Sequence, residues 1–398
     1  MNSLAKRKVL KNKKIIVAVA GSVAAYKSIE LVRELKKINA DVRVIMTPSA
    51  LKFVTPLSLE IASGNEVISD PFSRPFTHIE LPQWADAMVI APATANTLSK
   101  FFSASASDIV SACFLAFRGP VIAAPAMNWR MYTDDIFQER LDYLKEKGLI
   151  EVPPEKGDLA CGEEGLGRMA PIDTIMSEVK RTVTRKDLLK KKLVITAGPT
   201  REHIDPVRYI SNRSSGKMGV ALAKNAFLRG ADVTLISGPS CLEPPYGVKT
   251  HFIGTAEEMF GSVKSSVKGA DVLIMAAAVA DYKPKDIIKE KMDKKGTLNL
   301  QLVATADIIS TISSFKKKPL IVGFAAETGD KKDRAREKLN RKNMDMVVFN
   351  DVSLNGSGFD VDTNIITLIG KDTERDYPKM DKDEAASVIL DKISDMLS

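Results

Sequence analysis

The sequence predicts an α/β protein built from two three-layer, Rossmann-like domains with mainly parallel sheets. Continuous apolar strands alternate with amphipathic helices in the first half, and the alternation restarts at residue 193. Uninterrupted apolar strands are typical of parallel sheets that helices cover on both faces. The chain has 398 residues, more than the roughly 100–200 residues of one ordinary domain. Two related domains are therefore expected.

In the first half, a β-branched strand is expected at 15–21 and an amphipathic helix at 22–38. Apolar residues recur at helical spacing in this helix, and the strand ends at a glycine. Further buried strands are expected at 41–47, 87–94 and 120–126. The segment 176–192 is polar and helical in composition.

The second half repeats this pattern after a predicted boundary near residue 190, which gives domains 1–190 and 191–398. A long polar segment without helical pattern precedes the first helix of this half, KMGVALAKNAFLRG. The last helix is expected at 383–397. Strands are expected at 193–198, 232–238, 271–280, 320–326, 346–351 and 364–369.

Composition and motifs exclude several classes of function. The net charge is +8, but aromatic residues are only 6% and no basic stripe alternates with rings, so nucleic-acid binding is disfavoured. No G-x-G-x-x-G motif follows either first strand, and Met218 stands where a Walker A loop needs Ser or Thr. The three histidines lack ligand spacing and C-x-x-C is absent, which argues against structural zinc.

Cysteine content and hydropathy bear on the compartment. No apolar run reaches the length of about 18 residues that a membrane helix needs. The three cysteines cannot build a disulfide framework, so a cytoplasmic location without membrane partners is expected.

Three polar loops of the first half follow expected strands. They are Gly21-Ser22, Thr47-Pro48-Ser49 and 92–97. Loops between a parallel strand and a helix present free backbone N–H groups to phosphate. Ordinary turn and N-cap use of Ser, Thr and Asn is the alternative for any single loop.

Five motifs carry a resemblance over roughly residues 14–185: GSVAAYK, HIELPQWAD, APATANT, PAMNWRMY and LACGEEGLGRM. They resemble the flavin-dependent decarboxylase family that acts on 4′-phosphopantothenoylcysteine in coenzyme A synthesis. The resemblance implies FMN bound at a subunit interface, trimers that often form twelve-subunit shells, and catalytic roles for His78, Asn128 and Cys161. The implied FMN positions are Gly21, Ser22, Thr47, Ser49, Ala93, Thr94 and Asn96.

The chemistry of these three side chains suits such a reaction. Oxidation of the substrate thiol to a thioaldehyde creates the electron sink that lets the carboxylate leave as CO₂. A thiol with an ordinary pKa of about 8.5 can then protonate the ene-thiolate, which is the expected role of Cys161. Asn128 can hold a carboxylate or an amide by paired hydrogen bonds, and His78 can orient the substrate or act as a base. Core packing of the cysteine and a structural role of the histidine are the alternatives.

The segment 195–219 of the second half carries Arg201, Arg208, Arg213 and Lys217 beside Ser214, Ser215 and Gly216. Cations and small residues before a helix form a credible anion cradle. Small residues at 276–280 would let a flat base approach the backbone. Each lysine further along the chain, taken alone, is more typical of a solvated surface.

From about residue 191 to its end, the chain resembles the phosphopantothenate–cysteine ligase family. The resemblance implies a dimer that activates 4′-phosphopantothenate with CTP and Mg²⁺ as an acyl-cytidylate, which cysteine then attacks. It implies that Asn212 stabilises the developing oxyanion and that Lys291 stabilises the charge of the phosphates. It does not identify the Mg²⁺ ligands. The family's Lys-x-Lys-Lys motif has lost one lysine here, at Asp293. The implied nucleotide positions are Met275, Ala276, Ala277, Asp281, Ala306, Asp307, Ile308, Ile309, Phe324, Lys338 and Lys342.

Together the halves imply a bifunctional enzyme with a flavoprotein-type N-terminal domain and a ligase-type C-terminal domain. Its substrates would be 4′-phosphopantothenate, L-cysteine and CTP, followed by 4′-phosphopantothenoylcysteine. A flavin-binding regulatory protein without catalysis is one alternative, which the presence of His78, Asn128 and Cys161 disfavours. A flavin prenyltransferase-like enzyme is another, but it leaves the C-terminal half unexplained.

Overall fold

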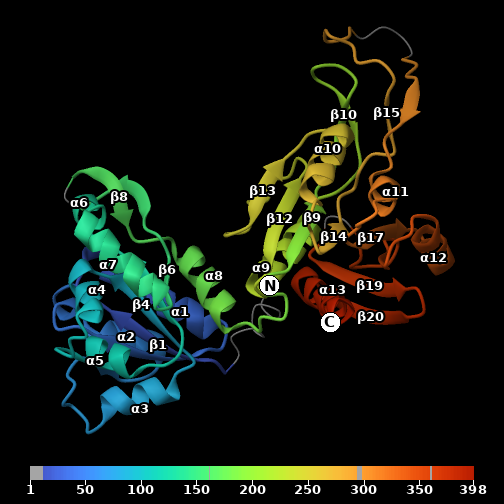
Figure 1. The fold of residues 1–398 in the computed structure, drawn as a ribbon. Helices are drawn as coiled ribbons and strands as arrows, with labels where there is room; N and C mark the ends of the chain where they lie inside the picture. The colour runs from blue at the N-terminus through green and yellow to red at the C-terminus, as the bar shows by residue number, and fades with distance from the viewer. Residues whose placement is uncertain (1–11, 161, 294–297, 359–360) are drawn as a thin grey trace. The chain divides into compact units, whose positions relative to one another are not determined.

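The chain forms two compact units, Met1–Thr184 and Arg185–Ser398, in a computed structural model (Figure 1). The structure describes residues 12–398 except 161, 294–297 and 359–360. The predicted boundary near residue 190 falls inside the second unit. There, Leu188 is fully buried in the core of that unit and the Arg229 Nε donates to Asp187 at 2.8 Å.

The first unit holds a six-stranded, fully parallel sheet in the order β3-β2-β1-β4-β5-β6, with a separate antiparallel hairpin, β7–β8. Its elements are β1 (Lys14–Val19), η1 (Val23–Tyr26), α1 (Lys27–Lys37), β2 (Asp41–Met46), η2 (Ala50–Lys52), α2 (Pro56–Ser63), β3 (Val67–Ile68), α3 (Thr77–Trp84), β4 (Ala87–Ala93), α4 (Ala95–Phe102), α5 (Ile109–Ala116), β5 (Val121–Pro125), α6 (Trp129–Tyr132), α7 (Asp135–Glu146), β6 (Leu149–Glu151), β7 (Glu155–Asp158), β8 (Glu164–Arg168) and α8 (Ile172–Val183).

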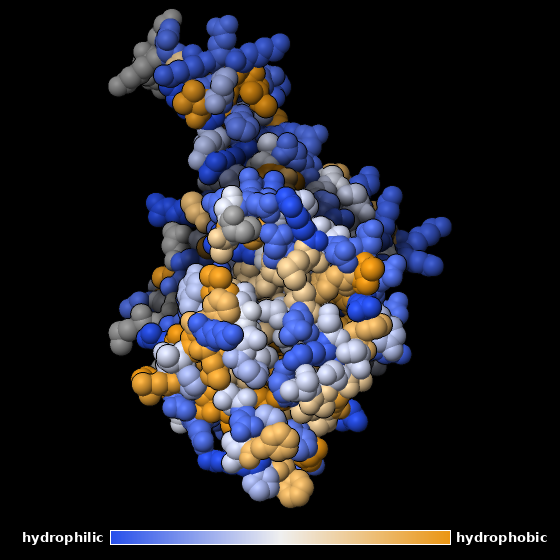
Figure 2. All heavy atoms as spheres, turned by 90° about the vertical axis from the view of Figure 1, so that its left-hand side faces the viewer, coloured by the Kyte–Doolittle hydropathy of each residue, from blue (hydrophilic) through white to orange (hydrophobic). Residues whose placement is uncertain are grey.

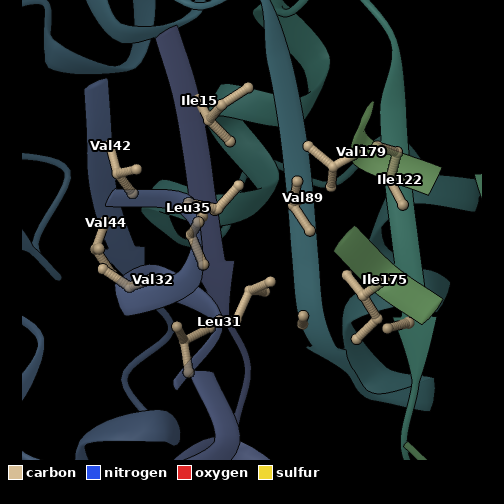
Figure 3. Packing of buried hydrophobic residues seen from close by; sticks show 14 of the residues in the cluster. Ile15, Leu31, Val32, Leu35, Val42, Val44, Val89, Ile122, Ile175 and Val179 are labelled. Atoms are coloured by element: carbon tan, nitrogen blue, oxygen red, sulfur yellow. The ribbon is translucent and has the colours of Figure 1, made fainter. Parts of the chain in front are cut away.

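Alternate side chains of β1 point to opposite faces of the sheet and pack into two separate cores, so the unit has three layers. Ile15 and its alternate neighbours pack with Leu31 and Leu35 of α1 and with Ile175 of α8 (Figure 3). Ile16 packs on the other face, against α4 and α5. Fully burying such a side chain stabilises the fold by about 1.5–3 kcal/mol, so a register shift by one residue would be costly.

The second unit holds an eight-stranded sheet in the order β13-β12-β9-β14-β17-β18-β19-β20, in which β19 runs antiparallel to its two neighbours and all other pairings are parallel. Hairpins β10–β11 and β15–β16 are separate from it. The elements are β9 (Lys192–Ala197), β10 (Arg201–His203), β11 (Tyr209–Ser211), α9 (Lys217–Leu228), β12 (Asp232–Ser237), β13 (Lys249–Phe252), α10 (Ala256–Ser266), β14 (Val272–Met275), β15 (Tyr282–Pro284), β16 (Leu302–Ala304), α11 (Ile308–Ser313), β17 (Leu320–Glu327), α12 (Lys332–Arg341), β18 (Met346–Asp351), β19 (Thr363–Gly370), β20 (Glu374–Asp381) and α13 (Lys382–Leu397).

Helices again cover both faces of the sheet. One core contains residues of α9 and α13, and the other contains residues of α10, α11 and α12. The predicted fold class, two Rossmann-like domains with mainly parallel sheets, is confirmed. Among the described residues, no helix combines the length and the apolar character that crossing a membrane requires.

Two predicted elements are wrong in extent. The strand expected at 271–280 ends at Met275, because the next N–H groups bond elsewhere: Ala277 N donates to the Thr196 hydroxyl at 3.1 Å and Ala280 N to the Thr200 hydroxyl at 3.0 Å. The helix expected at 176–192 spans Ile172–Val183, and the following residues belong to the second unit.

Candidate functional site

The polar loops after β1, β2 and β4 line one cavity of about 340 Å³ in the first unit. Parallel strands carry their following loops to the same edge of the sheet, which brings residues far apart in sequence together. The lining residues are Gly21, Ser22, Thr47, Ser49, Thr94, Ala95, Asn96, Thr97, Ala126, Met127 and Met131. Ala93, the last residue of β4, is fully buried and is not among the lining residues, and its carbonyl accepts a hydrogen bond from Ala126 N at 3.0 Å.

The backbone of this cavity is tightly built. A Cβ atom on Gly21 would lie 2.4 Å from the Cβ of Ser49, so only glycine lets the two loops approach this closely. The Thr94 hydroxyl caps α4 by accepting from Thr97 N at 3.3 Å. The other N–H groups of a first helical turn have no partner within the helix and are available to an anion.

The walls of the cavity differ in character. Hydroxyl groups and the Asn96 amide come from the strand loops, whereas Ala126, Met127 and Met131 supply an apolar side. A polar side for phosphate and an apolar side for a flat ring suit a flavin nucleotide, so these residues fit the expected FMN.

A second cavity of about 460 Å³ adjoins the first, because Ser22, Ala126 and Met127 line both. Its lining also contains Asn128 and, from the β7–β8 hairpin, Asp158 and Arg168. Gly167 of β8 lies directly on the preceding loop, since its carbonyl accepts from Met127 N at 3.1 Å. A chamber of this kind beside a flavin cavity can hold a substrate.

Asn128 is held in one orientation at the junction of the two cavities. Its Oδ1 accepts from Arg130 N at 2.9 Å, and its Nδ2 donates to Glu163 at 3.2 Å. The Glu163 carboxylate also accepts from Trp129 Nε1 at 3.0 Å and from the Arg130 guanidinium at 2.9 Å. The hydrogen bond from Asn128, with those from Trp129 and the charge of Arg130, lowers the pKa of Glu163.

Of the other two expected catalytic residues, the structure describes only His78, and it does not lie at this junction. His78 is the second residue of α3 and lines neither cavity. In Figure 1, α3 lies at the lower end of the first unit, whereas α6 and β8 lie at its upper end. Cys161 lies outside the described residues. Cys113 is fully buried in the core, as expected, and burial raises the pKa of its thiol to about 12.

In the second unit, Thr196 and Thr200 shape the loop that follows β14 by bonding to its N–H groups. Met275 ends that strand, and Ala276 and Ala277 begin the loop. The Asn212 amide donates to the carbonyl of Val279 at 3.0 Å, which places Asn212 against this loop.

A charged cluster lies beyond the same edge of the sheet. The Lys338 ammonium donates to the carbonyl of Phe324 at 2.8 Å, and Lys342 donates to Asp307 at 3.1 Å. Burial, followed by the charge of Lys342, lowers the pKa of Lys338, while Asp281 acts in the opposite direction. The structure therefore brings these five expected nucleotide positions together.

Asp307 also begins α11, where the remaining expected positions lie. It caps the helix by accepting from Ser310 N at 3.1 Å, Ala306 precedes it, and Ile308 and Ile309 are buried. Burial works against ionisation of Asp307, but the hydrogen bonds from Ser310 and Lys342 outweigh it and lower the pKa.

No described hydrogen bond or ion pair joins Lys291 to this cluster. The described contacts next to it join Met292 to Asp205, whose carboxylate accepts from Met292 N at 3.3 Å, and to Arg208, whose guanidinium donates to Met292 O at 3.1 Å. Two of the four cations of the expected cradle have carboxylate partners within this unit. Arg208 is paired with Asp205 at 2.7 Å and Lys217 with Asp362 at 2.7 Å.

Sequence reasoning missed Lys27, Arg168 and Glu163, and also Thr196 in β9 and Thr200 after it. The motifs quoted for the first half contain the first three, but nothing local assigns them a cavity. Thr196 and Thr200 did carry a signal, because buried hydroxyl residues next to a strand need hydrogen-bond partners.

The fold and sites define a two-unit α/β enzyme, with a cofactor-type cavity at one parallel sheet and a cationic cluster at the other. Residues 3–184 match the family Flavoprotein, and residues 188–397 match the DNA/pantothenate metabolism flavoprotein C-terminal domain. The chain belongs to the family of coenzyme A biosynthesis bifunctional proteins named CoaBC.

Known relatives match nearly the whole chain. The protein of Vibrio cholerae is 41% identical over 98% of this chain and 99% of the relative. The protein of Escherichia coli K12 is 43% identical over 96% and 97%. A crystal structure of the C-terminal domain of a CoaBC protein is 41% identical, with a TM-score of 0.47, and covers 53% of this chain and 98% of that one.

The chain is therefore a bifunctional enzyme with a decarboxylase half of the flavoprotein type and a ligase half. It carries out two consecutive steps of coenzyme A biosynthesis. These are the ligation of cysteine to 4′-phosphopantothenate and the decarboxylation of 4′-phosphopantothenoylcysteine to 4′-phosphopantetheine.

Proposed function

We propose that the first unit holds FMN in the cavity formed by the loops after β1, β2 and β4. The convergence of these loops on one cavity is the observation that carries the proposal. When bound, FMN supplies a two-electron acceptor for the thiol end of the substrate and returns the electrons after CO₂ has left. The hydroxyl groups of Ser22, Ser49 and Thr94 hold its phosphate or ribityl chain, and Met127 packs on its ring.

Asn128 positions the reacting end of the substrate. Its amide stands where the flavin cavity and the second cavity meet, and its hydrogen bonds to Arg130 and Glu163 hold it in place. The amide can bind the substrate carboxylate or amide before the C–C bond breaks. Cys161 lies outside the described residues, and by resemblance it donates the proton that completes the product.

His78 completes the site from a second copy of the chain. Within one chain it lies away from the cavity, but the segment around it carries exposed apolar side chains: Phe72 is 90% exposed, Phe76 70% and Ile79 39%. The face drawn in Figure 2 likewise carries apolar areas among hydrophilic ones. Burying such side chains between copies supports the trimer of decarboxylase units, and its twelve-subunit assembly, that the resemblance implies.

In the second unit, Lys338 and Lys342 bind the CTP phosphates, and the small residues after β14 admit the base. The described residues contain no cluster of three or more metal-binding side chains. Mg²⁺ would therefore arrive on the CTP phosphates, with one or two carboxylates such as Asp281 as protein ligands. Asn212 donates to the acyl oxygen as negative charge develops on it.

Lys291 reaches the nucleotide site of a second copy. The segment that carries it joins β15 to β16, and this arm exposes large apolar side chains: Tyr282 is 57% exposed, Ile287 63% and Leu302 46%. An arm of this kind is suited to pack on another chain, which supports a dimer of ligase units.

Cys113 and Cys241 are free thiols, as suits a reducing cytoplasm.

Two variants of the full chain test the division of labour. Asn128→Asp places a carboxylate against that of Glu163 and removes an amide donor. Loss of such a donor should lower decarboxylation about 10²–10³-fold and leave ligation unchanged. Asn212→Asp should lower ligation and leave decarboxylation of supplied 4′-phosphopantothenoylcysteine unchanged. The flavin absorption spectrum serves as the folding control, and equal loss of both activities in either variant would contradict the assignment.

Rapid quenching with labelled CTP separates the two steps of ligation. Lys291→Gln should suppress pyrophosphate release, because phosphate charge is stabilised when the first bond forms. Asn212→Asp should still release pyrophosphate but accumulate the acyl-cytidylate. If both variants lose the intermediate equally, Asn212 serves activation or binding and its oxyanion role is wrong.

A further inference from the structure

Asp205 is a fully buried carboxylate that has no part in the function proposed above. It lies in the loop that joins β10 to β11. Burying a carboxylate is costly unless the group is paired and hydrogen-bonded. The partners of Asp205 therefore indicate its role, and its two oxygen atoms bond to different parts of the chain.

The Oδ1 atom of Asp205 shapes the loop of its own hairpin. It accepts from Val207 N at 2.8 Å and from Arg208 N at 2.7 Å. Aspartate side chains commonly form such turns with the backbone two or three residues further along the chain. The neutral amide oxygen of an asparagine could accept these two bonds as well, so the turn alone does not require a carboxylate.

The Oδ2 atom contacts the arm between β15 and β16, on which Lys291 lies. It accepts from Met292 N at 3.3 Å and from Arg208 Nη1 at 2.7 Å. Arg208 Nη1 also donates to Met292 O at 3.1 Å. The ion pair therefore binds both the N–H and the carbonyl of Met292, the residue directly after Lys291. A further bond, from Ile288 N to Ile204 O at 2.9 Å, joins the same loop to the same arm.

These contacts keep Asp205 ionised. Burial works against ionisation, but the hydrogen bonds from the backbone of Val207, Arg208 and Met292 and from the Arg208 side chain outweigh it and lower the pKa to about 2. The Oδ2 atom accepts from two donors, and the amide nitrogen of an asparagine would place a third donor against them. The contact with the arm, unlike the turn, therefore requires a carboxylate.

We propose that Asp205 is a positioning residue for ligation, which together with Arg208 clamps the arm at Met292 and so holds Lys291 in place. The inference rests on the role proposed for Lys291 in stabilising the CTP phosphates. Lys291 is exposed, and its long side chain can meet a phosphate reproducibly only if the backbone that carries it is fixed. A misplacement of about 1 Å can cost on the order of 100-fold in rate.

Asp205→Asn removes the clamp and keeps the turn. In the full chain it should lower the rate of CTP-dependent pyrophosphate release about 10- to 100-fold and leave decarboxylation of supplied 4′-phosphopantothenoylcysteine unchanged. In a chain that already carries Lys291→Gln, it should cause no further loss, because Asp205 acts through Lys291. Asp286→Asn is the matched control, since Asp286 is exposed on the same arm, and it should release pyrophosphate at the unaltered rate.

Limited digestion with trypsin measures the clamp without any activity. Cleavage after Lys291 requires the arm to leave the loop that holds it, so its rate reports the population of the open arm. Mass spectrometry of the fragments should show this cleavage about 10-fold faster or more in Asp205→Asn, as loss of a hydrogen bond to a charged group predicts. Asp286→Asn should be cut at the rate of the unaltered chain.

Unaltered pyrophosphate release or unaltered cleavage in Asp205→Asn would overturn the proposal. A further loss in the Lys291→Gln chain would also overturn it, because Asp205 would then act by another route. A second unit that no longer unfolds cooperatively on heating would make Asp205 a purely structural residue. Normal pyrophosphate release by Lys291→Gln alone would instead show that the role proposed for Lys291 is wrong, and the cleavage rates would still report the clamp separately.

Discussion

Lys338 illustrates how the surroundings of one side chain would suit it to the nucleotide proposed for the second unit. Its ammonium donates to the backbone of β17, and burial together with Lys342 lowers its pKa below the ordinary 10.5. A lysine in this state is costly to keep charged in the empty site, because few solvent dipoles reach it. Phosphate oxygens of the proposed nucleotide would supply a counter-charge to this ammonium.

The lowered pKa predicts that nucleotide binding weakens at alkaline pH. As the pH rises toward 10.5, Lys338 loses its proton before an ordinary lysine would, and the phosphates lose a cation. Calorimetric titration of CTP across this range should show the dissociation constant rising in the unaltered chain. Lys338→Arg, which keeps its charge, should remove this alkaline limb.

Lys317 is exposed, and Lys317→Gln controls for a general loss of positive charge. The control should keep the alkaline limb. A CTP affinity that stays constant up to pH 10.5 in the unaltered chain would show that Lys338 does not bind the phosphates.

Single residues also show where prediction from sequence ends. Gly21, Ser49 and Asn96 follow apolar strands, and parallel pairing alone brings them to one edge, so the cavity could be predicted. Lys27 of α1 and Arg168 of β8 line one cavity only through the tertiary fold, which leaves no local signal in the sequence. The motif around Lys291 likewise does not predict that this residue lies on the segment that joins β15 to β16.

At the scale of elements, strand β8 closes the second cavity by lying flat on the loop before α6. A Cβ atom on Gly167 would lie 2.1 Å from Met127 O, and one on Gly165 would lie 2.5 Å from the Trp129 ring. Neither clash can be relieved without moving backbone or an indole ring. Two glycines two residues apart on one strand face are thus a requirement of this contact.

Gly167→Ala should therefore lower decarboxylation at least about 10-fold, since small misplacements of a site cost rate steeply. Ligation by the same chain should be unchanged, because the second unit has its own cores. Gly157→Ala is the matched control, with an ordinary contact of 3.5 Å to Arg168. Both activities are measured on each purified variant, and normal decarboxylation by Gly167→Ala would disprove the tight contact.

Strands could be predicted where the hydropathy pattern of a segment agrees with its pairing in the sheet. The apolar run of β18 at 346–351 was predicted without error, because a buried parallel strand leaves a continuous signal. The run at 271–280 is just as apolar, but its second half forms a loop held by Thr196 and Thr200. Hydropathy alone cannot distinguish a strand from a buried loop whose N–H groups have side-chain partners.

At the scale of the whole molecule, residues 185–190, which precede the first strand of the second unit, are part of that unit. Leu188 is fully buried there, and Asp187 accepts from the Arg229 guanidinium, whose side chain is 5% exposed. A ligase fragment that starts at residue 191 would lose both contacts. A fragment of 185–398 keeps them.

The fragment 185–398 should consequently unfold at a higher temperature than the fragment 191–398. Loss of one buried leucine alone costs about 2–5 kcal/mol, and Arg229 loses one of its two carboxylate partners while keeping Asp391. The fragment 1–184 should fold, turn yellow and decarboxylate supplied 4′-phosphopantothenoylcysteine. Calorimetry and absorption spectra check these outcomes, and equal unfolding temperatures for the two ligase fragments would contradict the assignment of residues 185–190.

The most direct measurement follows the carboxyl carbon of cysteine through both halves. The purified full chain is given 4′-phosphopantothenate, CTP, Mg²⁺ and cysteine labelled in its carboxyl group. Labelled CO₂ should be released only when both CTP and 4′-phosphopantothenate are present, and 4′-phosphopantetheine, CMP and pyrophosphate should form in equal amounts. Release of CO₂ without CTP, or accumulation of 4′-phosphopantothenoylcysteine without CO₂, would contradict the account of two consecutive steps in one chain.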